Sequence, residues 1–256
     1  MSCYFAIRFD DRIEMMTDGA VFNIEGRFVR DKNKSGVALF APVAVAGVGE
    51  EPDIEVMTEV VLTAAFFLSS VDEMIEVLGE ELPKFEPTIG ASAIVIACIS
   101  ETRGPLILTY KNTEDRLVNR GDSHAFGPGL DIDEMLATGV DFSFPDGLRS
   151  DGVQLLKAMR AKPCEQFAGL PLGHYVGGHI DWTVVDRNGA RVERVLDWDD
   201  VPGQPIEVGE RESLLSSRCH ARRTPSVESM REAQRRDVEV TSMLLEGVMR
   251  KHSNKD

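Results

Sequence analysis

The second residue of the chain, Ser2, combines a hydroxyl group with a chain terminus that processing can expose. Because Ser2 is small, we expect an aminopeptidase to remove Met1 and free the Ser2 α-amine. An α-amino group has an ordinary pKa of about 8, so it can act as a general base near neutral pH. The hydroxyl of the same residue is then a nucleophile beside its own base, which is the arrangement needed to attack a carbonyl group.

A terminal nucleophile of this kind needs three further parts. A cation holds the amine and hydroxyl in their reactive protonation states, a carboxylate orients that cation, and backbone N–H groups stabilise the oxyanion. The chain has a candidate for each part: Asp18 for the carboxylate, Lys34 for the cation, and Gly47 and Gly49 at the end of an apolar strand for the N–H donors.

Each of these residues is ordinary when taken alone. Asp18-Gly19 is a common turn signal, Lys32 is a rival for the role of Lys34, and Ser2 is a usual residue after Met1. Many apolar strands end in glycines. The functional interpretation therefore rests on the joint spacing of these residues.

The elements that must position these residues alternate between strands and helices. Short apolar segments bounded by turn residues predict strands, at 3–9, 12–17, 21–30, 37–40, 43–47, 92–99, 105–111, 123–126, 179–187 and 191–197. Helical spacing of apolar residues predicts helices, at 54–67, from Ser70 to Pro83, at 131–138 and at 148–160. Ser70 and Glu73 form a predicted capping box. Strands followed by a helix pair, twice over, predict an α+β fold with two sheets between helix layers, a four-layer αββα sandwich.

The last part of the chain has a different composition. From about residue 204 the strand pattern is lost, Arg and Glu become frequent, and 225–250 is helix-prone. We predict one domain over 1–203 and a C-terminal helical extension over 204–256. A loosely ordered, solvated tail is the alternative.

The first fifty residues resemble the start of a proteasome-type N-terminal-nucleophile hydrolase. Proteasome β-subunits and the peptidase subunit of the bacterial heat-shock-locus protease open with a nucleophile, two strands and Asp-Gly. A lysine and an apolar strand that ends in a Gly-rich turn follow. This chain has the same order in Ser2, Asp18-Gly19, Lys34 and 43–49. It also resembles the related bacterial Anbu family. The resemblance extends more weakly to about residue 197, through 92–111, 125–129 and 177–189.

The resemblance implies a role for each predicted site residue. Ser2 would be the nucleophile and its freed amine the base, with Lys34 as the cation and Asp18 as its partner. The Gly49 N–H would be the first oxyanion donor and the Gly47 N–H the next. It also implies the N-terminal-nucleophile hydrolase fold, no metal or organic cofactor, and a homo-oligomer such as a ring. It leaves open whether an unfoldase partner exists.

Four positions depart from the family pattern. Ser replaces the usual Thr nucleophile, and lacks the methyl group that restricts its rotamer. Pro128 stands where the family has the Ser of a Gly-Ser-Gly turn, and Gly173 and Val176 stand where it has an Asp and a Ser. The core trio is kept, but the accessory groups that help set protonation are not.

Composition excludes several other functions. The formal charge of −15 argues against nucleic-acid binding. No apolar run is long enough to span a bilayer, and no signal peptide is recognised, so we expect a cytoplasmic protein. The four cysteines show no metal or redox spacing and are interpreted as free thiols.

We interpret Cys3 as a core residue, the histidines His124, His174 and His179 as hydrogen-bonded structural residues, and 197–200 as a solvated turn.

The predicted function is therefore that of an N-terminal-nucleophile amidohydrolase, a proteasome-like peptidase that acts on peptide or other amide bonds. The alternative is a non-catalytic proteasome-like subunit that serves as a scaffold or binds a partner, which the altered positions Pro128, Gly173 and Val176 favour. A third hypothesis is a small-molecule amide hydrolase on the same fold.

The catalytic hypothesis makes a direct prediction about the mature N-terminus. Intact-mass measurement of the purified protein is expected to show a chain that has lost Met1, because only then is the Ser2 amine free. A protein that retains Met1 throughout has no such base, and that result contradicts the catalytic hypothesis.

Overall fold

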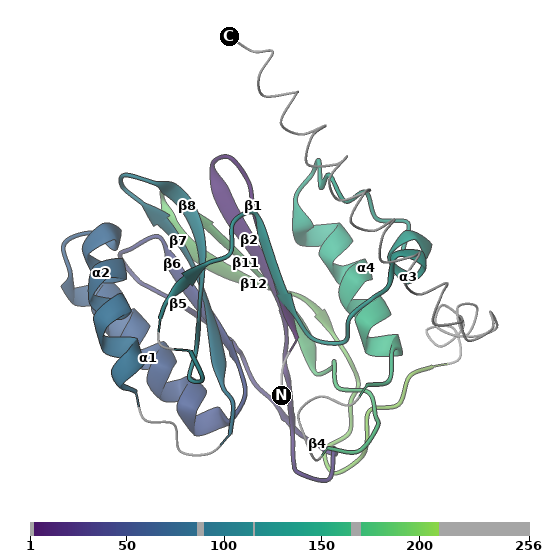
Figure 1. Cartoon of the computed structure of the whole chain (residues 1–256). Helices are drawn as coiled ribbons and strands as arrows, with labels where there is room; N and C mark the ends of the chain where they lie inside the picture. The colour runs from purple at the N-terminus through teal and green to yellow at the C-terminus, as the bar shows by residue number, and fades with distance from the viewer. Residues whose placement is uncertain (1–2, 86–89, 115, 165–169, 210–256) are drawn as a thin grey trace, which may run out of the picture. The chain divides into compact units, whose positions relative to one another are not determined.

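The computed structural model describes residues 3–85, 90–114, 116–164 and 170–209. The chain divides into two units, Met1–Ser217 and Arg218–Asp256, and all described residues belong to the first. This unit is a mixed α+β structure built on antiparallel sheets, as predicted (Figure 1). The helix predicted over 225–250 lies outside the described residues.

Two five-stranded antiparallel sheets form the centre of the first unit. The first sheet contains, in spatial order, β10 (Ser123–Phe126), β1 (Tyr4–Arg8), β2 (Arg12–Asp18), β11 (His179–Asp186) and β12 (Gly189–Asp197). The second contains β5 (Ser35–Val37), β6 (Val43–Val48), β7 (Ala93–Ser100), β8 (Gly104–Lys111) and β9 (Val118–Asn119). A separate two-stranded ribbon is formed by β3 (Ala20–Phe22) and β4 (Phe28–Asp31).

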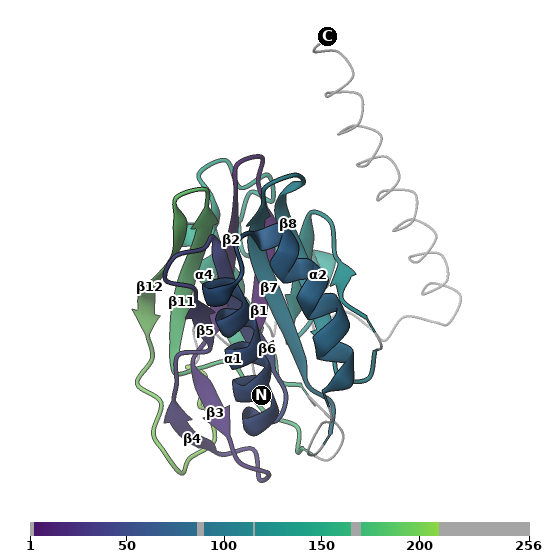
Figure 2. The ribbon, with the colours of Figure 1, turned by 90° about the vertical axis from the view of Figure 1, so that its left-hand side faces the viewer.

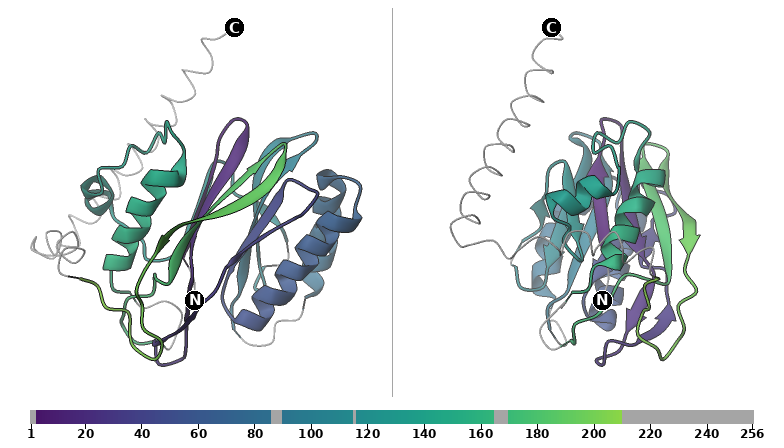
Figure 3. Two further views of the ribbon diagram at one scale, coloured as in Figure 1. Left: turned by 180° about the vertical axis from the view of Figure 1, so that it is seen from behind. Right: turned by 90° about the vertical axis from the view of Figure 1, so that its right-hand side faces the viewer.

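The two sheets lie face to face, and each carries helices on its other face (Figures 1 and 2). The second sheet is covered by α1 (Glu51–Phe67) and α2 (Val71–Glu81), which leads into the 3-10 turn η1 (Leu82–Lys84). The first sheet is covered by α4 (Leu148–Ala161), with α3 (Ile132–Ala137) beside it, as the views from behind and from the right show (Figure 3). Among the described helices, none combines the length and apolarity needed to cross a membrane.

Side-chain alternation along the central strands builds the core. Met15 on β2 packs between the sheets, whereas its neighbour Met16 packs toward α4. On β6, Val45 packs toward α1 and Ala46 packs between the sheets. Successive side chains of a strand point to opposite faces, so strands that are buried on both faces need apolar residues at consecutive positions.

A buried carboxylate attaches α4 to the first sheet. Glu14 on β2 is buried and accepts hydrogen bonds from the N–H of Leu148, at the start of α4, and from the indole N–H of Trp182 on β11, each at 2.8 Å. A negative charge at a helix N-terminus is favourable because the first N–H groups lack helical partners. Gly147 is required beside it, since a Cβ there would approach Glu14 Oε1 to 2.6 Å.

The predicted capping box at the start of α2 is only half formed. The Ser70 hydroxyl accepts the Glu73 N–H at 3.1 Å, as predicted. The Glu73 carboxylate, however, binds the N–H and hydroxyl of Ser69 instead of the Ser70 N–H. The neighbouring serine offers two donors where Ser70 offers one, so it captures the carboxylate. A complete capping box occurs in α3, between Asp131 and Glu134.

The described part of the predicted C-terminal extension packs on the β3–β4 ribbon. The Phe28 N–H donates to the Gln204 carbonyl at 2.9 Å, and Ile206 is buried against Ala20 and Phe28. Residues 204–209 therefore contribute to the first unit.

The Ser70 cap predicts a measurable loss of stability. Ser70→Ala removes the acceptor for the Glu73 N–H, and we expect it to lower the free energy of unfolding by about 1 kcal/mol. Urea denaturation measures this change. Ser143→Ala, in an exposed loop where the hydroxyl bonds only Asp141, is the control and should change stability by less than about 0.5 kcal/mol. Equal stability of the Ser70 variant and the control would contradict the assigned role.

Candidate active site

Asp18, the last residue of β2, is fully buried and accepts four hydrogen bonds. Its Oδ1 receives the Cys3 N–H at 2.7 Å and the Lys34 ammonium at 2.9 Å. Its Oδ2 receives the N–H groups of Ala20 at 3.2 Å and Gly177 at 3.3 Å. A buried carboxylate is stable only when its oxygens are satisfied in this way. The structure therefore brings Asp18 and Lys34 together, in direct contact with the backbone of the N-terminal strand.

The two rival lysines, Lys34 and Lys32, have separate partners. The Lys34 side chain is 8% exposed and pairs with Asp18. Lys32 is 28% exposed and pairs at 2.5 Å with both Glu51 and Glu55 on α1. Lys34, not Lys32, thus faces the Asp18 carboxylate, because the two side chains leave the segment before β5 toward different neighbours.

The N–H of Gly49 points toward the end of the sheet where Lys34 lies. Along β6, residues whose backbone N–H and C=O point toward β7 alternate with residues whose groups point toward β5. The Ile99 N–H donates to the Pro42 carbonyl, so the even-numbered residues in and next to β6 are the ones that point toward β7. Val48 is one of them. In a trans peptide, the N–H of one residue points opposite to the C=O of the residue before it. The Gly49 N–H therefore points away from β7, toward the side of β6 on which β5 lies, and Lys34 directly precedes β5.

Gly49 also occupies a position that only glycine fits well. Its φ of +131° is unfavourable for residues with a side chain, and a Cβ there would lie 2.5 Å from Ser92 Oγ. The Ser92 hydroxyl accepts the Glu50 N–H at 3.1 Å and thereby holds the turn after β6. Sequence reasoning missed Ser92, because nothing in the local sequence relates it to a turn more than forty residues earlier.

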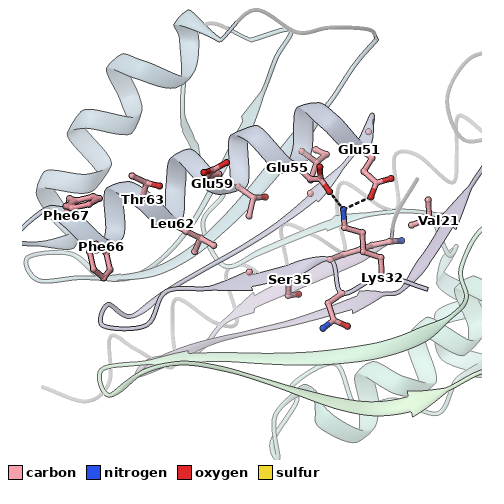
Figure 4. Close-up of a pocket in the computed structure, with 17 residues that line it drawn as sticks. Val21, Lys32, Ser35, Glu51, Glu55, Glu59, Leu62, Thr63, Phe66 and Phe67 are labelled. Carbon is pink, nitrogen blue, oxygen red and sulfur yellow. Dashed lines mark hydrogen bonds and ion pairs between the residues drawn. The ribbon is translucent and has the colours of Figure 1, made fainter. Parts of the chain in front are cut away.

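A cavity of about 580 Å³ opens beside these residues, between α1 and the β5 edge of the second sheet (Figure 4). Lys34, Gly47 and Gly49 all contribute to its lining. Acidic residues of α1 line the cavity near the first turns of the helix, and apolar residues line it further along. The lining residues of α1 are Glu51, Ile54, Glu55, Thr58, Glu59, Leu62, Thr63, Phe66 and Phe67. The arrangement is a cleft with a charged end at Lys34 and a more apolar far end.

A second cavity, of about 820 Å³, is lined by residues of β1, β10 and α4, among them Phe5, His124 and Met159. Its lining includes none of Asp18, Lys34, Gly47 and Gly49. Of these two cavities, the first is therefore the one that Lys34, Gly47 and Gly49 line.

Ser2, the predicted nucleophile, lies outside the described residues. The next residue, Cys3, is buried and its sulfur contacts Met159, in agreement with its interpretation as a core residue. Burial, followed by the charge of Asp18, raises the pKa of the Cys3 thiol well above its ordinary value. Cys3 is thus a neutral packing residue.

The interpretation of 197–200 as a solvated turn was wrong for Asp200. Its side chain is 5% exposed and pairs with Arg160 of α4 at 2.6 Å, while its Oδ2 accepts the Gly178 N–H at 2.7 Å. Arg160 also donates to the Val176 carbonyl at 2.8 Å. This pair fixes the backbone on both sides of Gly177, the residue that donates to Asp18, which local sequence composition does not reveal.

His179, the first residue of β11, is hydrogen-bonded and structural in the sense predicted, but its surroundings were not foreseen. Its ring lies between Asp31 and Asp181 and is buried. Within the described residues, no group of three or more His, Cys, Asp or Glu side chains is arranged to hold a metal ion.

Comparison with known proteins leaves the chain without an assigned family. No protein-family model matches it, and no curated protein matches its sequence.

The four-donor environment predicts that Asp18 is essential to the fold around the site. Asp18→Asn removes the carboxylate that pairs with the buried Lys34 ammonium, so we expect the free energy of unfolding to fall by about 3 to 5 kcal/mol. Urea unfolding followed by tryptophan fluorescence measures the change. Asp186→Asn is the matched control at an ion pair with the largely exposed Arg191, and should cost at most about 1 kcal/mol. A comparable loss in both variants would refute the special role of Asp18.

Proposed function

We propose that this chain is an N-terminal-nucleophile amidohydrolase, a proteasome-like peptidase that uses Ser2 after removal of Met1. In this proposal, the two sheets and their helices form the four-layer αββα sandwich of that fold. The observation that carries the proposal is the buried Lys34–Asp18 pair bound to the Cys3 N–H. The Cys3 N–H belongs to the peptide bond that joins Cys3 to Ser2, so Asp18 binds the peptide group directly after the proposed nucleophile.

The proposed reaction uses the chain's own groups. The Ser2 hydroxyl oxygen attacks the substrate carbonyl carbon, and its proton passes to the Ser2 amine. Lys34, held by Asp18, supplies positive charge beside the hydroxyl and favours its ionised form. The Gly49 N–H stabilises the oxyanion. The leaving amine takes the proton, and water activated by the Ser2 amine then hydrolyses the ester.

The cleft beside Lys34 supports a substrate with an extended chain. It runs along α1 from Glu51 toward Leu62 and Phe66 (Figure 4), and Lys34 and Gly49 are among the residues that line it. An apolar wall of this kind buries apolar side chains of a peptide, while the charged end lies at the proposed reacting bond. We therefore favour a peptide over a small-molecule amide.

The alternative function, a non-catalytic proteasome-like subunit, is favoured by Pro128, Gly173 and Val176. Val176 is buried and its side chain contributes only apolar contacts to the core beside α4. None of these side chains supplies the oxygen that the family has at its position. A subunit that kept the fold but lost the groups that set protonation at the nucleophile would have such substitutions at these three positions.

A covalent probe separates the two functions. A β-lactone is expected to acylate the Ser2 oxygen of the processed protein, with cleavage of the lactone C–O bond and transfer of the hydroxyl proton to the released alkoxide. Peptide mass spectrometry locates the ester. Ser2→Ala abolishes labelling, and Lys34→Ala slows it by at least about 100-fold, because proton management in the site is lost.

Lys32→Ala is the control for Lys34→Ala. Its ion pairs are partly exposed, so we expect labelling within about fivefold of the wild-type rate. An unlabelled Ser2 in a protein that has lost Met1, under conditions that label an active proteasome, would establish the non-catalytic function instead.

A further inference from the structure

We propose that His179 is a positioning residue for Lys34. Its ring, clamped between Asp31 and Asp181, fixes the backbone segment from which Lys34 reaches Asp18. The inference rests on the proposed function for its catalytic consequence, but the positioning itself concerns the fold and can be measured separately.

The clamp is a cluster of charges around a buried ring, in which His179 and Asp181 are buried and Asp31 and Arg194 are partly exposed. His179 is fully buried, with Nδ1 at 2.5 Å from Asp31 Oδ1 and Nε2 at 2.9 Å from Asp181 Oδ2. Asp181 is buried on the same strand, β11, and Asp31 ends β4. Arg194 of β12 lies 3.5 Å from Asp31 and 3.7 Å from Asp181, and also pairs with Asp197 at 3.3 Å. Both ring nitrogens therefore face carboxylates, and the cationic Arg194 Nη2 also lies 3.3 Å from Nε2.

Two glycines make room for this cluster directly beside Asp18. A Cβ on Gly19 would lie 2.2 Å from both Asp31 Oδ1 and His179 Nδ1, and one on Gly178 would lie 2.4 Å from Asp31 Oδ1. Gly19 follows Asp18 in the chain, and its N–H donates to the His179 carbonyl at 3.0 Å. The Asp31 carboxylate thus enters a gap that any larger residue would close.

The cluster holds the segment that leads to Lys34. Asp31 pairs with His179, the Lys32 N–H donates to the Gly19 carbonyl at 2.9 Å, and Asn33 Oδ1 accepts from Arg194 at 2.7 Å. Three consecutive residues are therefore tied to β11, β12 and the Asp18–Gly19 turn immediately before Lys34. Loss of the His179 contact leaves Asp31 with the longer contact to Arg194, so we expect the base of the lysine side chain to shift.

The protonated ring is the form that fits the cluster. Burial by itself lowers the pKa of His179, but the hydrogen bond and charge of Asp181, followed by those of Asp31, outweigh burial and raise it above the ordinary value. The imidazolium then donates from both nitrogens, one to each carboxylate. Since the pKa is raised in the folded state, this stabilisation is complete below about pH 6.5 and is lost as the pH rises through the folded-state pKa.

The test compares His179→Gln with wild type in three measurements. We expect hydrogen exchange to become faster in peptides that cover 31–37, and β-lactone labelling of Ser2 to slow by about 10- to 100-fold, as for a displaced catalytic group. The melting-temperature difference between wild type and variant is expected to shrink as the pH rises, since wild type loses its imidazolium. Asp31→Asn should reproduce these effects, and the double variant should label no more slowly than the slower single variant.

Two further variants keep the test decisive. Arg194→Gln, at a side chain that is 39% exposed, is expected to fold even if His179→Gln does not, and to loosen 31–37 in the same direction. Arg191→Gln is the control, because its ion pair with Asp186 lies at the other end of β11, about 20 Å away. It should leave exchange over 31–37 and labelling unchanged.

The outcomes separate the two proposals. Wild-type exchange over 31–37 and wild-type labelling in folded His179→Gln or Arg194→Gln would overturn the positioning role. Faster exchange in 31–37 together with slower labelling supports it. If the wild-type protein is not labelled at all, the proposed function fails, whereas localised loosening of 31–37 in the variants still supports positioning of Lys34 by His179.

Discussion

The arrangement of the site depends on one buried carboxylate, Asp18. A charge in the interior is tolerated only when a counter-charge and hydrogen-bond donors surround it. The donors to Asp18 come from Cys3 just before β1, from Ala20 at the start of β3, from Lys34 in the segment before β5, and from Gly177 before β11. Most of these donors are distant in sequence, so satisfying one side chain requires the two sheets and the ribbon to meet at the same point.

The segment from Asp31 to Lys34 is held from two sides by different ion clusters. On one side Asp31 and Asn33 bind His179 and Arg194 of the first sheet. On the other side Lys32 binds Glu51 and Glu55 of α1, which packs on the second sheet. Buried ion pairs contribute little net stability because desolvation offsets their attraction, but a wrong arrangement leaves charges unpaired. The His179 cluster therefore specifies where Lys34 lies more than it stabilises the fold, whereas the partly exposed Lys32 pairs contribute little to either.

Glycines at the site allow polar side chains from other elements to approach the backbone closely. Gly19 and Gly178 admit the Asp31 carboxylate, and Gly49 admits Ser92 while directing its N–H toward the cleft. Each lies where a backbone turn meets a polar side chain from another element. In the proposed chemistry, Lys34 is the cation and the Gly49 N–H is the oxyanion donor, and both residues line the cleft along α1.

Much of this could be predicted from sequence because the relevant signals are local. Alternating and helical apolar patterns predicted the strand and helix order, and hence the α+β class, since burial of one face of an element requires that periodicity. The order of Ser2, Asp18, Lys34 and Gly49 predicted the candidate site, and the structure brings Asp18 and Lys34 into contact. The choice of Lys34 over Lys32 stayed open, because both are cations in the same polar segment.

Only the tertiary structure decided what the polar side chains pair with. Asp200 was predicted to lie in a solvated turn, but its side chain is buried and pairs with Arg160. Glu73 was predicted to complete a capping box with Ser70, but its carboxylate binds Ser69 instead. In the sequence His179 has no evident partner, and it is the fold that brings Asp31 and Arg194 beside it. Periodicity encodes which face of an element is buried. The partner of a buried charge is set by three-dimensional proximity between segments far apart in the chain, and a single sequence carries no local signal of that distance.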